Sequence, residues 1–318
     1  MKTRAEHLNS FIQKYHLTNV IWLCPDASTR RYARVERKGK NYILMDSPLS
    51  EKPKEFVKID TILRKYKVPV PKIYAKNLRH GFVLLEDFGD LLLSQAIQKN
   101  ASTNDLYILA LDTLIGLQKR VKDRSKLPDA FKLMAEQNDW FIDYYAPYVL
   151  KKPLSQKAKD EFHRIWHKLF LGMHKIPKTL VLYDFHMDNI MVKSDGSLGL
   201  LDFQDAMEGP IFYDLISFVE DERHPLPIKT RRELLNHYFE LRPVLGSKHY
   251  ADWVDVVSAH RHTRVIGNFV KLAIESKKKN YLKYIKNDWM FLRENLKNPL
   301  LKEYKDWLKK YFPNQLKG

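Results

Sequence analysis

One stretch of this chain, residues 179–214, places three polar side chains in an order that few folds can use. Asp184 is followed five residues later by Asn189, and Asp202 comes after two short apolar runs. Those runs flank the turn Ser194-Asp195-Gly196-Ser197, which predicts a β-hairpin. Because a hairpin brings its two ends together, we expect Asn189 and Asp202 to lie close to each other.

These residue types suit phosphoryl transfer from a nucleoside triphosphate. A carboxylate such as Asp184 can accept the proton of a substrate hydroxyl, and the amide oxygen of Asn189 can face Mg²⁺ without adding negative charge. Asp202 supplies an anionic ligand, and Mg²⁺ is usually held by one or two carboxylates and the phosphates. Each residue alone also fits an ordinary loop or a helix cap. The ordered set predicts Asp184 as catalytic base and Asn189 and Asp202 as metal ligands.

The motifs Asp-Phe-His-Met-Asp-Asn at 184–189 and Leu-Asp-Phe-Gln-Asp at 201–205 resemble the catalytic core of the aminoglycoside phosphotransferase and choline kinase superfamily. The chain is most similar to its bacterial N-acetylmuramate/N-acetylglucosamine anomeric sugar kinases. The resemblance implies an α+β, two-lobed protein-kinase-like fold with a small antiparallel sheet lobe and a mainly helical lobe. Further similar segments are Asp26–Tyr32, Tyr42–Asp46, Val68–Tyr74, Leu84–Gly89, Gly209–Leu215 and Arg264–Phe269.

The resemblance also implies an activity. We expect ATP and Mg²⁺ to bind, and the γ-phosphoryl group to pass to the anomeric hydroxyl of an amino sugar, N-acetylmuramate or N-acetylglucosamine, in peptidoglycan recycling. The alternatives are a kinase of another alcohol, such as choline or an aminoglycoside, and a nucleotide-binding pseudokinase. Two departures favour the pseudokinase, because Met45 and Asp46 stand where kinases carry a strand lysine and Leu182 where they often carry a histidine. The intact Asp-Asn-Asp set argues against it.

The length, charge and cysteine content of the chain limit its domain organisation and its classes of binding partner. With 318 residues and 44% hydrophobic content, the chain can form two lobes, which we expect over residues 1–90 (nucleotide-binding) and 91–318 (catalytic and substrate-binding). The net charge of +17 is spread among acidic residues, so we expect attraction to anionic nucleotide, with neither nucleic acid nor membrane as partner. One cysteine, Cys24, and no long apolar stretch favour a cytoplasmic protein, which we expect to be a monomer.

The loop of residues 25–31 stands where kinases place a glycine-rich phosphate lid, but it contains no glycine. Ser28 and Thr29 could supply hydroxyl donors to phosphates, and Arg30 or Arg31 could supply charge. Arg31 is the first candidate to replace the strand lysine and Arg30 the second. An ordinary polar hairpin is the alternative interpretation.

Two acids complete the expected nucleotide site. Glu55 lies early in an amphipathic helix that starts at Pro53, and it either faces inward or only complements the helix dipole. Glu86 ends a strand, and we expect the turn that follows to be the hinge between the two lobes, where backbone groups would pair with the edge of adenine. The Asp87-Phe88-Gly89 that follows resembles a kinase metal motif but precedes Asp184 by about a hundred residues, so we interpret it as a hinge turn.

Residues of the second lobe are candidates for acceptor binding. Gln204 and Asp205 follow Asp202, and Glu136 lies on one predicted helical face with aromatic residues, an arrangement that fits either a sugar site or core packing. Basic residues at 261, 264 and 271 either border this site or form a solvated face. Helices are expected at 3–16, 53–66, 102–121, 130–148, 156–174, 228–241, 248–275, 280–296 and 299–311, and strands at 19–23, 32–36, 42–45, 73–75 and 82–85.

Overall fold

The computed structural model describes residues 3–24, 29–99 and 103–317. The chain forms two compact units. Unit 1 consists of Met1–Ala101 and Asp188–Asp205, and unit 2 of Ser102–Met187 and Ala206–Gly318. The chain therefore leaves unit 2 within residues 179–214, called the catalytic stretch after its predicted role, and returns to unit 2 after eighteen residues.

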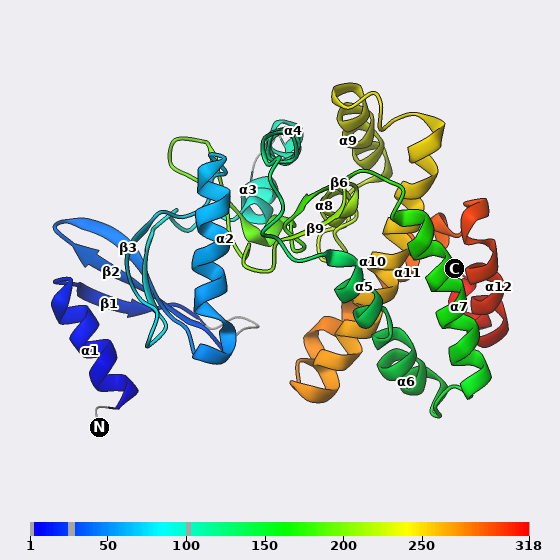
Figure 1. Cartoon of the computed structure of the whole chain (residues 1–318), viewed down its shortest axis with the longest axis horizontal. Coiled ribbons are helices and arrows are strands. Elements are labelled where there is room, and N and C mark those ends of the chain that lie inside the picture. The colour runs from blue at the N-terminus through cyan, green and yellow to red at the C-terminus, as the bar shows by residue number, and fades with distance from the viewer. Residues whose placement is uncertain (1–2, 25–28, 100–102, 318) are drawn as a thin grey trace. The chain divides into compact units, whose positions relative to one another are not determined.

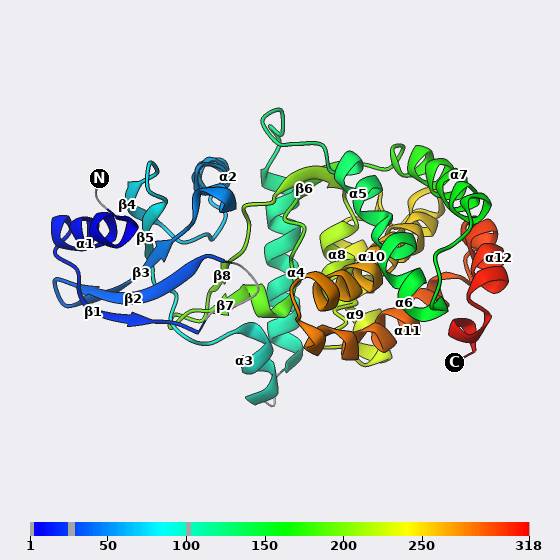
Figure 2. The same cartoon turned by 90° about the horizontal axis from the view of Figure 1, so that it is seen from below.

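Unit 1 is built on a five-stranded antiparallel sheet in the order β1-β2-β3-β5-β4; Figure 1 labels its first three strands and Figure 2 labels all five. Side chains alternate along β2, where Ala33 and Val35 are fully buried between more exposed neighbours. This alternation is expected where one face of a sheet lies in the core. The strands are β1 Thr18–Trp22, β2 Arg31–Arg37, β3 Lys40–Asp46, β4 Ile73–Asn77 and β5 Phe82–Glu86.

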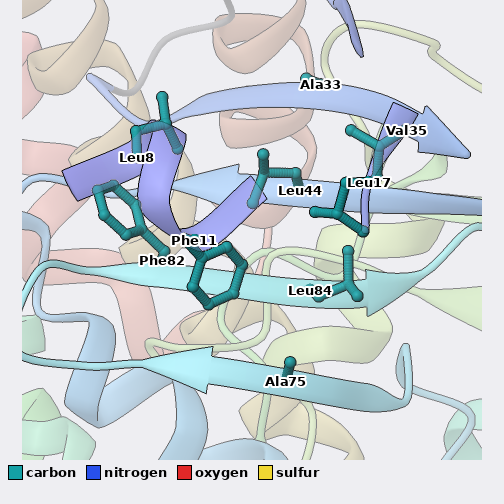
Figure 3. Packing of buried hydrophobic residues seen from close by; sticks show 9 residues of the cluster. All are labelled: Leu8, Phe11, Leu17, Ala33, Val35, Leu44, Ala75, Phe82 and Leu84. Atoms are coloured by element: carbon teal, nitrogen blue, oxygen red, sulfur yellow. The ribbon is translucent and has the colours of Figure 1, made fainter. Parts of the chain in front are cut away.

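Helix α1, Arg4–Lys14, supplies apolar side chains to the core of this sheet. It begins at a capping box, in which the side chain of Thr3 accepts from the Glu6 N–H and the side chain of Glu6 accepts from the Thr3 N–H. Leu8 and Phe11 lie on the same side of the helix and join buried side chains of β2, β3 and β5 in one cluster (Figure 3). Each such burial contributes about 1.5–3 kcal/mol to stability.

Three further elements complete unit 1. Helix α2, Pro53–Lys65, starts with proline in its first turn and buries Phe56, Ile59 and Leu63. A hairpin pairs β7, Ile190–Val192, with β8, Leu198–Leu200. Backbone hydrogen bonds from Val192 to Leu91 (2.8 Å) and from Leu200 to Pro69 (2.7 Å) tie this hairpin to the rest of the unit. Helix α3, Leu93–Lys99, follows, and Leu49–Glu51 is a short 3-10 helix, η1.

Unit 2 is mainly helical (Figure 2). The long helix α10 packs against α5, α7, α8 and α11. A two-stranded sheet pairs β6, Lys178–Val181, with β9, Met207–Pro210. This pairing brings together the two ends of the segment 182–206, which contains the predicted catalytic residues. The helices are α4 Thr103–Arg120, α5 Ala130–Asn138, α6 Ala146–Leu150, α7 Gln156–Met173, α8 Tyr213–Val219, α9 Ile228–Leu241, α10 Lys248–Glu275, α11 Ile285–Asn295 and α12 Lys302–Tyr311; the short turns are η2 Phe141–Tyr145, η3 Met187–Asn189, η4 Lys279–Tyr284, η5 Pro299–Leu301 and η6 Pro313–Leu316.

The predicted α+β class is confirmed, with an antiparallel sheet first and helices after it. The helix expected over 130–148 is instead α5, a π-helical turn (η2) and α6. At this point Gly267 of α10 lies so close to the backbone of Trp140 and Phe141 that a β-carbon would overlap it. The pairing of β6 with β9 was not predicted. Within the described residues, no helix has the length and apolar character needed to cross a membrane.

Candidate active site

Unit 1 contains a cavity of about 490 Å³. Its wall combines apolar side chains from the sheet, from α2 and from the segments around the β7–β8 hairpin with several polar ones, a combination typical of small-molecule sites. Five of the residues singled out in the sequence line this cavity: Arg30, Glu86, Asn189, Asp202 and Gln204. The other lining residues are Leu23, Cys24, Tyr32, Arg34, Ile43, Phe56, Pro71, Leu85, Asp87, Phe88, Gly89, Asp90, Leu92, Asp188, Met191, Leu201 and Phe203.

One wall of the cavity is the segment that follows β5. Glu86 pairs with Lys72 through two bonds, since its carboxylate accepts from the Lys72 N–H (3.0 Å) and its own N–H donates to the Lys72 carbonyl (2.8 Å). The Asp87 carboxylate accepts two bonds from Arg34 (2.6 and 3.2 Å) and one from the Gly89 N–H (2.9 Å). Asp87 therefore holds a turn, in which Gly89 has a positive φ of 91° that glycine tolerates best.

Arg30 is the buried cation of the cavity wall. Its Nη2 donates to the Glu51 carbonyl (2.8 Å), and its Nε lies 3.9 Å from the Glu51 carboxylate. The hydroxyl of Thr29 donates to the same carboxylate (2.6 Å). Met45, which stands where a kinase lysine was expected, is fully buried.

Arg31 has different surroundings. Its guanidinium pairs with Asp46 and lies over the ring of Trp22 (4.5 Å), and 57% of its side chain is exposed. It does not line the cavity. Ser28 lies outside the described residues. Of the two arginines considered from the sequence, the second-ranked one, Arg30, is therefore in the cavity wall.

The β7–β8 hairpin brings Asn189 and Asp202 to the cavity, as predicted from the turn between them. The Asn189 carbonyl accepts from the Leu201 N–H (2.9 Å), which closes the end of the hairpin. Asp202 then adopts a positive φ of 54°, a strained conformation for a residue with a β-carbon. Its carboxylate accepts from the Gln204 amide (2.9 Å), which fixes its orientation.

Aromatic rings pack against the β7–β8 hairpin at two places, within β8 and just after it. The ring of Phe203 packs against Phe56 of α2, with centroids 4.9 Å apart. Gly199 in β8 lies directly against the ring of Phe88, and a β-carbon at this position would overlap that ring. An amide oxygen and a carboxylate at one cavity wall form the oxygen donor set that Mg²⁺ prefers, so these residues fit the ion that the resemblance implies.

Asp184 belongs to unit 2 and lies in a segment fixed by buried polar contacts. The buried Asp214 carboxylate accepts from the backbone N–H groups of Leu182 (2.6 Å) and Tyr183 (3.0 Å). Burial raises the pKa of Asp214 to about 7, against the opposing effect of these two hydrogen bonds. Asp184 itself is partly exposed between buried neighbours, so its carboxylate remains accessible.

Tyr183 is held in a left-handed conformation, with a φ of 78°, directly before Asp184. Such a conformation costs about 1–3 kcal/mol for a bulky residue and persists only where its surroundings determine it. The Tyr183 ring stacks on Tyr213 (centroids 4.8 Å apart, planes at 4°), and its hydroxyl donates to Gln137 (2.6 Å). The guanidinium of Arg264 lies 4.7 Å from the same ring.

His186 anchors the other side of Asp184. Arg223 donates through Nη1 to the buried His186 ring (2.6 Å to Nε2). Burial, followed by the positive charge of Arg223, lowers the pKa of His186 and keeps the imidazole neutral as an acceptor. This contact fixes the His186 ring two residues after Asp184 and involves Arg223, which the sequence did not suggest.

Three predicted site residues lie away from these groups. Glu55 pairs with Lys58 on the surface of α2 (3.5 Å) and does not line the cavity; Glu51 occupies the place beside Arg30. Asp205 is exposed and accepts from Gln204 (3.3 Å), and it is not part of the cavity wall. Glu136 is 61% exposed on α5, whereas the next residue, Gln137, contacts Tyr183.

The chain is similar to known phosphotransferases in sequence. Residues 24–247 match the phosphotransferase enzyme family APH. An N-acetylmuramate/N-acetylglucosamine kinase of Pseudomonas putida is 30% identical over 277 residues, which cover 85% of this chain and 81% of the relative. A kinase of the same name from Caulobacter vibrioides is 26% identical over 91% of this chain and 90% of its own.

Solved structures share the fold. Choline kinase LicA from Streptococcus pneumoniae superposes with a TM-score of 0.66 at 12% identity, covering 91% of this chain and 99% of the other. The gentamicin complex of the aminoglycoside phosphotransferase APH(2'')-IIa superposes with a TM-score of 0.62 at 15% identity, covering 91% and 96%. At these identities the likeness is one of fold.

Proposed function

We propose that this chain, a small-molecule kinase that belongs to the phosphotransferase enzyme family, transfers the γ-phosphoryl group of ATP to the anomeric hydroxyl of N-acetylmuramate or N-acetylglucosamine. The observation that carries the phosphoryl transfer is the shared cavity of Arg30, Asn189 and Asp202. The acceptor rests on relatives of that name that align over most of the chain. We further propose a cytoplasmic monomer that acts on sugars released in cell-wall recycling.

In this proposal the cavity of unit 1 receives ATP. Ile43, Leu85 and Met191 offer apolar contacts for the adenine ring, and backbone groups near Glu86 offer hydrogen bonds to its edge. Arg30 takes the role of the strand lysine, because it is a buried cation already oriented by Glu51. A guanidinium donates to phosphate oxygens in a fixed fork, which suits this role.

Asn189 and Asp202 would hold Mg²⁺, while Gln204 keeps the Asp202 carboxylate in place. The bound ion neutralises charge on the phosphates. Two oxygen donors suffice because phosphate oxygens and waters complete the coordination of Mg²⁺.

Asp184 would act as the base that accepts the proton of the anomeric hydroxyl as this oxygen bonds to the γ-phosphorus and the β-phosphate oxygen leaves. The contacts of Asp214 with the backbone and of Arg223 with His186 position this carboxylate from both sides. Because the segment is already ordered, little reorganisation is needed at the moment of transfer.

The test measures phosphoryl transfer from ATP, in the presence of Mg²⁺, to N-acetylmuramate, N-acetylglucosamine, choline and kanamycin. For the two sugars, the loss of reducing-end reactivity reports whether the anomeric hydroxyl is the one phosphorylated. We expect transfer to the two sugars, which masks their reducing end. The Asp184→Ala variant should lose transfer by about a thousandfold or more while it still binds ATP. Transfer to choline or kanamycin alone would refute the acceptor, and undiminished turnover by Asp184→Ala would refute the catalytic role.

A further inference from the structure

Three arginines are buried in the described part of the chain, and they differ in their partners. Arg30 lies near the Glu51 carboxylate, and Arg261 donates to the Glu222 carboxylate (2.8 Å). Arg264 has no carboxylate within ion-pair distance among the described residues. A buried charge without an opposite charge is costly unless something else compensates it.

The contacts of Arg264 use little of its hydrogen-bonding capacity. Its Nη1 donates to the Gln137 side-chain oxygen (3.3 Å), and its buried Nε has no acceptor among the described residues. A guanidinium carries five N–H donors in one plane. The group therefore has donors to spare for an anion.

The position of Arg264 connects these donors to the reaction. Its guanidinium faces the ring of Tyr183, the residue before Asp184, and shares the Gln137 oxygen with the Tyr183 hydroxyl. The Asp184 carboxylate is close enough to interact with Arg264 electrostatically. All these residues belong to unit 2, so this neighbourhood is a property of that unit alone.

We propose that Arg264 binds the carboxylate of N-acetylmuramate and thereby makes this acceptor preferred over N-acetylglucosamine. The inference rests on the proposed function and assigns the specificity within it. N-acetylmuramate differs from N-acetylglucosamine by a lactyl ether that carries a carboxylate. An arginine with unused donors recognises a carboxylate through two parallel hydrogen bonds.

The experiment compares three acceptors at saturating ATP and Mg²⁺: N-acetylmuramate, its methyl ester, which has the same ring and ether without the charge, and N-acetylglucosamine. The full-length wild type is compared with Arg264→Gln, Arg264→Lys and the control Lys271→Gln. Lys271 is a cation on the same helix, seven residues further on, already paired with Glu275 (2.7 Å). Thermal melting of each variant verifies its fold.

We expect the wild type to favour the acid over the ester in kcat/KM by about tenfold to a hundredfold, the effect of a charged hydrogen bond. Arg264→Gln should abolish this preference chiefly through KM, Arg264→Lys should retain part of it, and Lys271→Gln should retain all of it. Turnover of N-acetylglucosamine serves as the internal measure of intact chemistry.

Three results would overturn the proposal. An equal loss on all acceptors would assign Arg264 to the phosphoryl group or to Asp184, and an unchanged preference in Arg264→Gln would deny it any role. A similar loss of the preference in Lys271→Gln would indicate that the positive charge of α10 as a whole attracts the carboxylate, without a specific contact from Arg264. Failure of the wild type on both sugars would instead refute the proposed function on which the inference depends.

Discussion

The two parts of the catalytic stretch are held in place by different forces. The part in unit 2, around Asp184, is fixed by buried polar groups: a carboxylate on two backbone N–H groups, a stacked tyrosine and an arginine on a neutral histidine. The part in unit 1, with Asn189 and Asp202, is fixed by a short hairpin and aromatic packing. Thus the proposed base, Asp184, depends on buried polar contacts, whereas the proposed metal ligands, Asn189 and Asp202, depend on local chain geometry and shape.

The largest effect should come from Asp214→Ala, which removes the acceptor of two buried N–H groups. We expect a loss of about 3 kcal/mol in the free energy of unfolding, measured by urea denaturation, because both donors are left unpaired. Misplacement of Asp184 should also lower kcat by about a hundredfold. The control, Asp195→Ala in the exposed hairpin turn, should leave the midpoint of urea denaturation nearly unchanged. Equal effects of the two variants would remove the contrast between the regions.

A smaller effect should follow from Gly199→Ala in β8, which tests the apolar side of the comparison. The new β-carbon would push against Phe88 in the cavity wall, at a cost of about 1–3 kcal/mol. Nucleotide affinity, measured by calorimetry, should fall by about tenfold while the pH dependence stays unchanged. Gly116→Ala in α4 is the matched control, since its β-carbon would meet no atom closer than 3.6 Å, and we expect it to be neutral or slightly stabilising.

A third test of the comparison varies the pH. The pKa of Asp214 is about 7 in the folded protein, above its ordinary value of 3.8, so between these pH values the folded state holds a proton that unfolding releases. The contribution of Asp214 to stability should therefore fall as pH rises from about 4 to about 7, by at most about 1.4 kcal/mol per unit, and stay constant above. The stability advantage of the wild type over Asp214→Ala should shrink across this window. A constant difference would show that Asp214 is charged throughout.

Sequence reasoning succeeded where the cause is local. The hairpin and the meeting of Asn189 with Asp202 follow from turn residues and apolar runs, and α1 and α2 follow from periodicity and caps. It ranked Arg31 above Arg30 because the loop sequence does not reveal which guanidinium the start of β2 turns toward the cavity.

Other features depend on contacts between distant residues. A π-helical turn after α5 changes the helical phase, so the straight-helix pattern that joins Glu136 to the later aromatic residues does not describe this region. Within α5 itself, Gln137 contacts Tyr183, whereas Glu136 is exposed. The sequence left open whether the basic residues 261, 264 and 271 of α10 border the acceptor site or form a solvated face, and two of them, Arg261 and Arg264, are buried. Only the packing of α10 against its neighbours decides this, and no local pattern encodes it.

The division of the chain into two interleaved units limits how this protein can evolve by recombination. Unit 1 is formed by two segments that are separated in the sequence, 1–101 and 188–205, and both line its cavity. No uninterrupted gene segment therefore encodes unit 1 alone with its complete cavity. A recombination event that joined residues 1–101 to a foreign second half would replace Asn189 and Asp202 as well, and would discard the hairpin that fits Phe88. Because the proposed acceptor-binding residue Arg264 belongs to unit 2, new acceptor specificities are expected to arise by substitution within unit 2, or by exchange of segments that end before Asp188 or begin after Asp205.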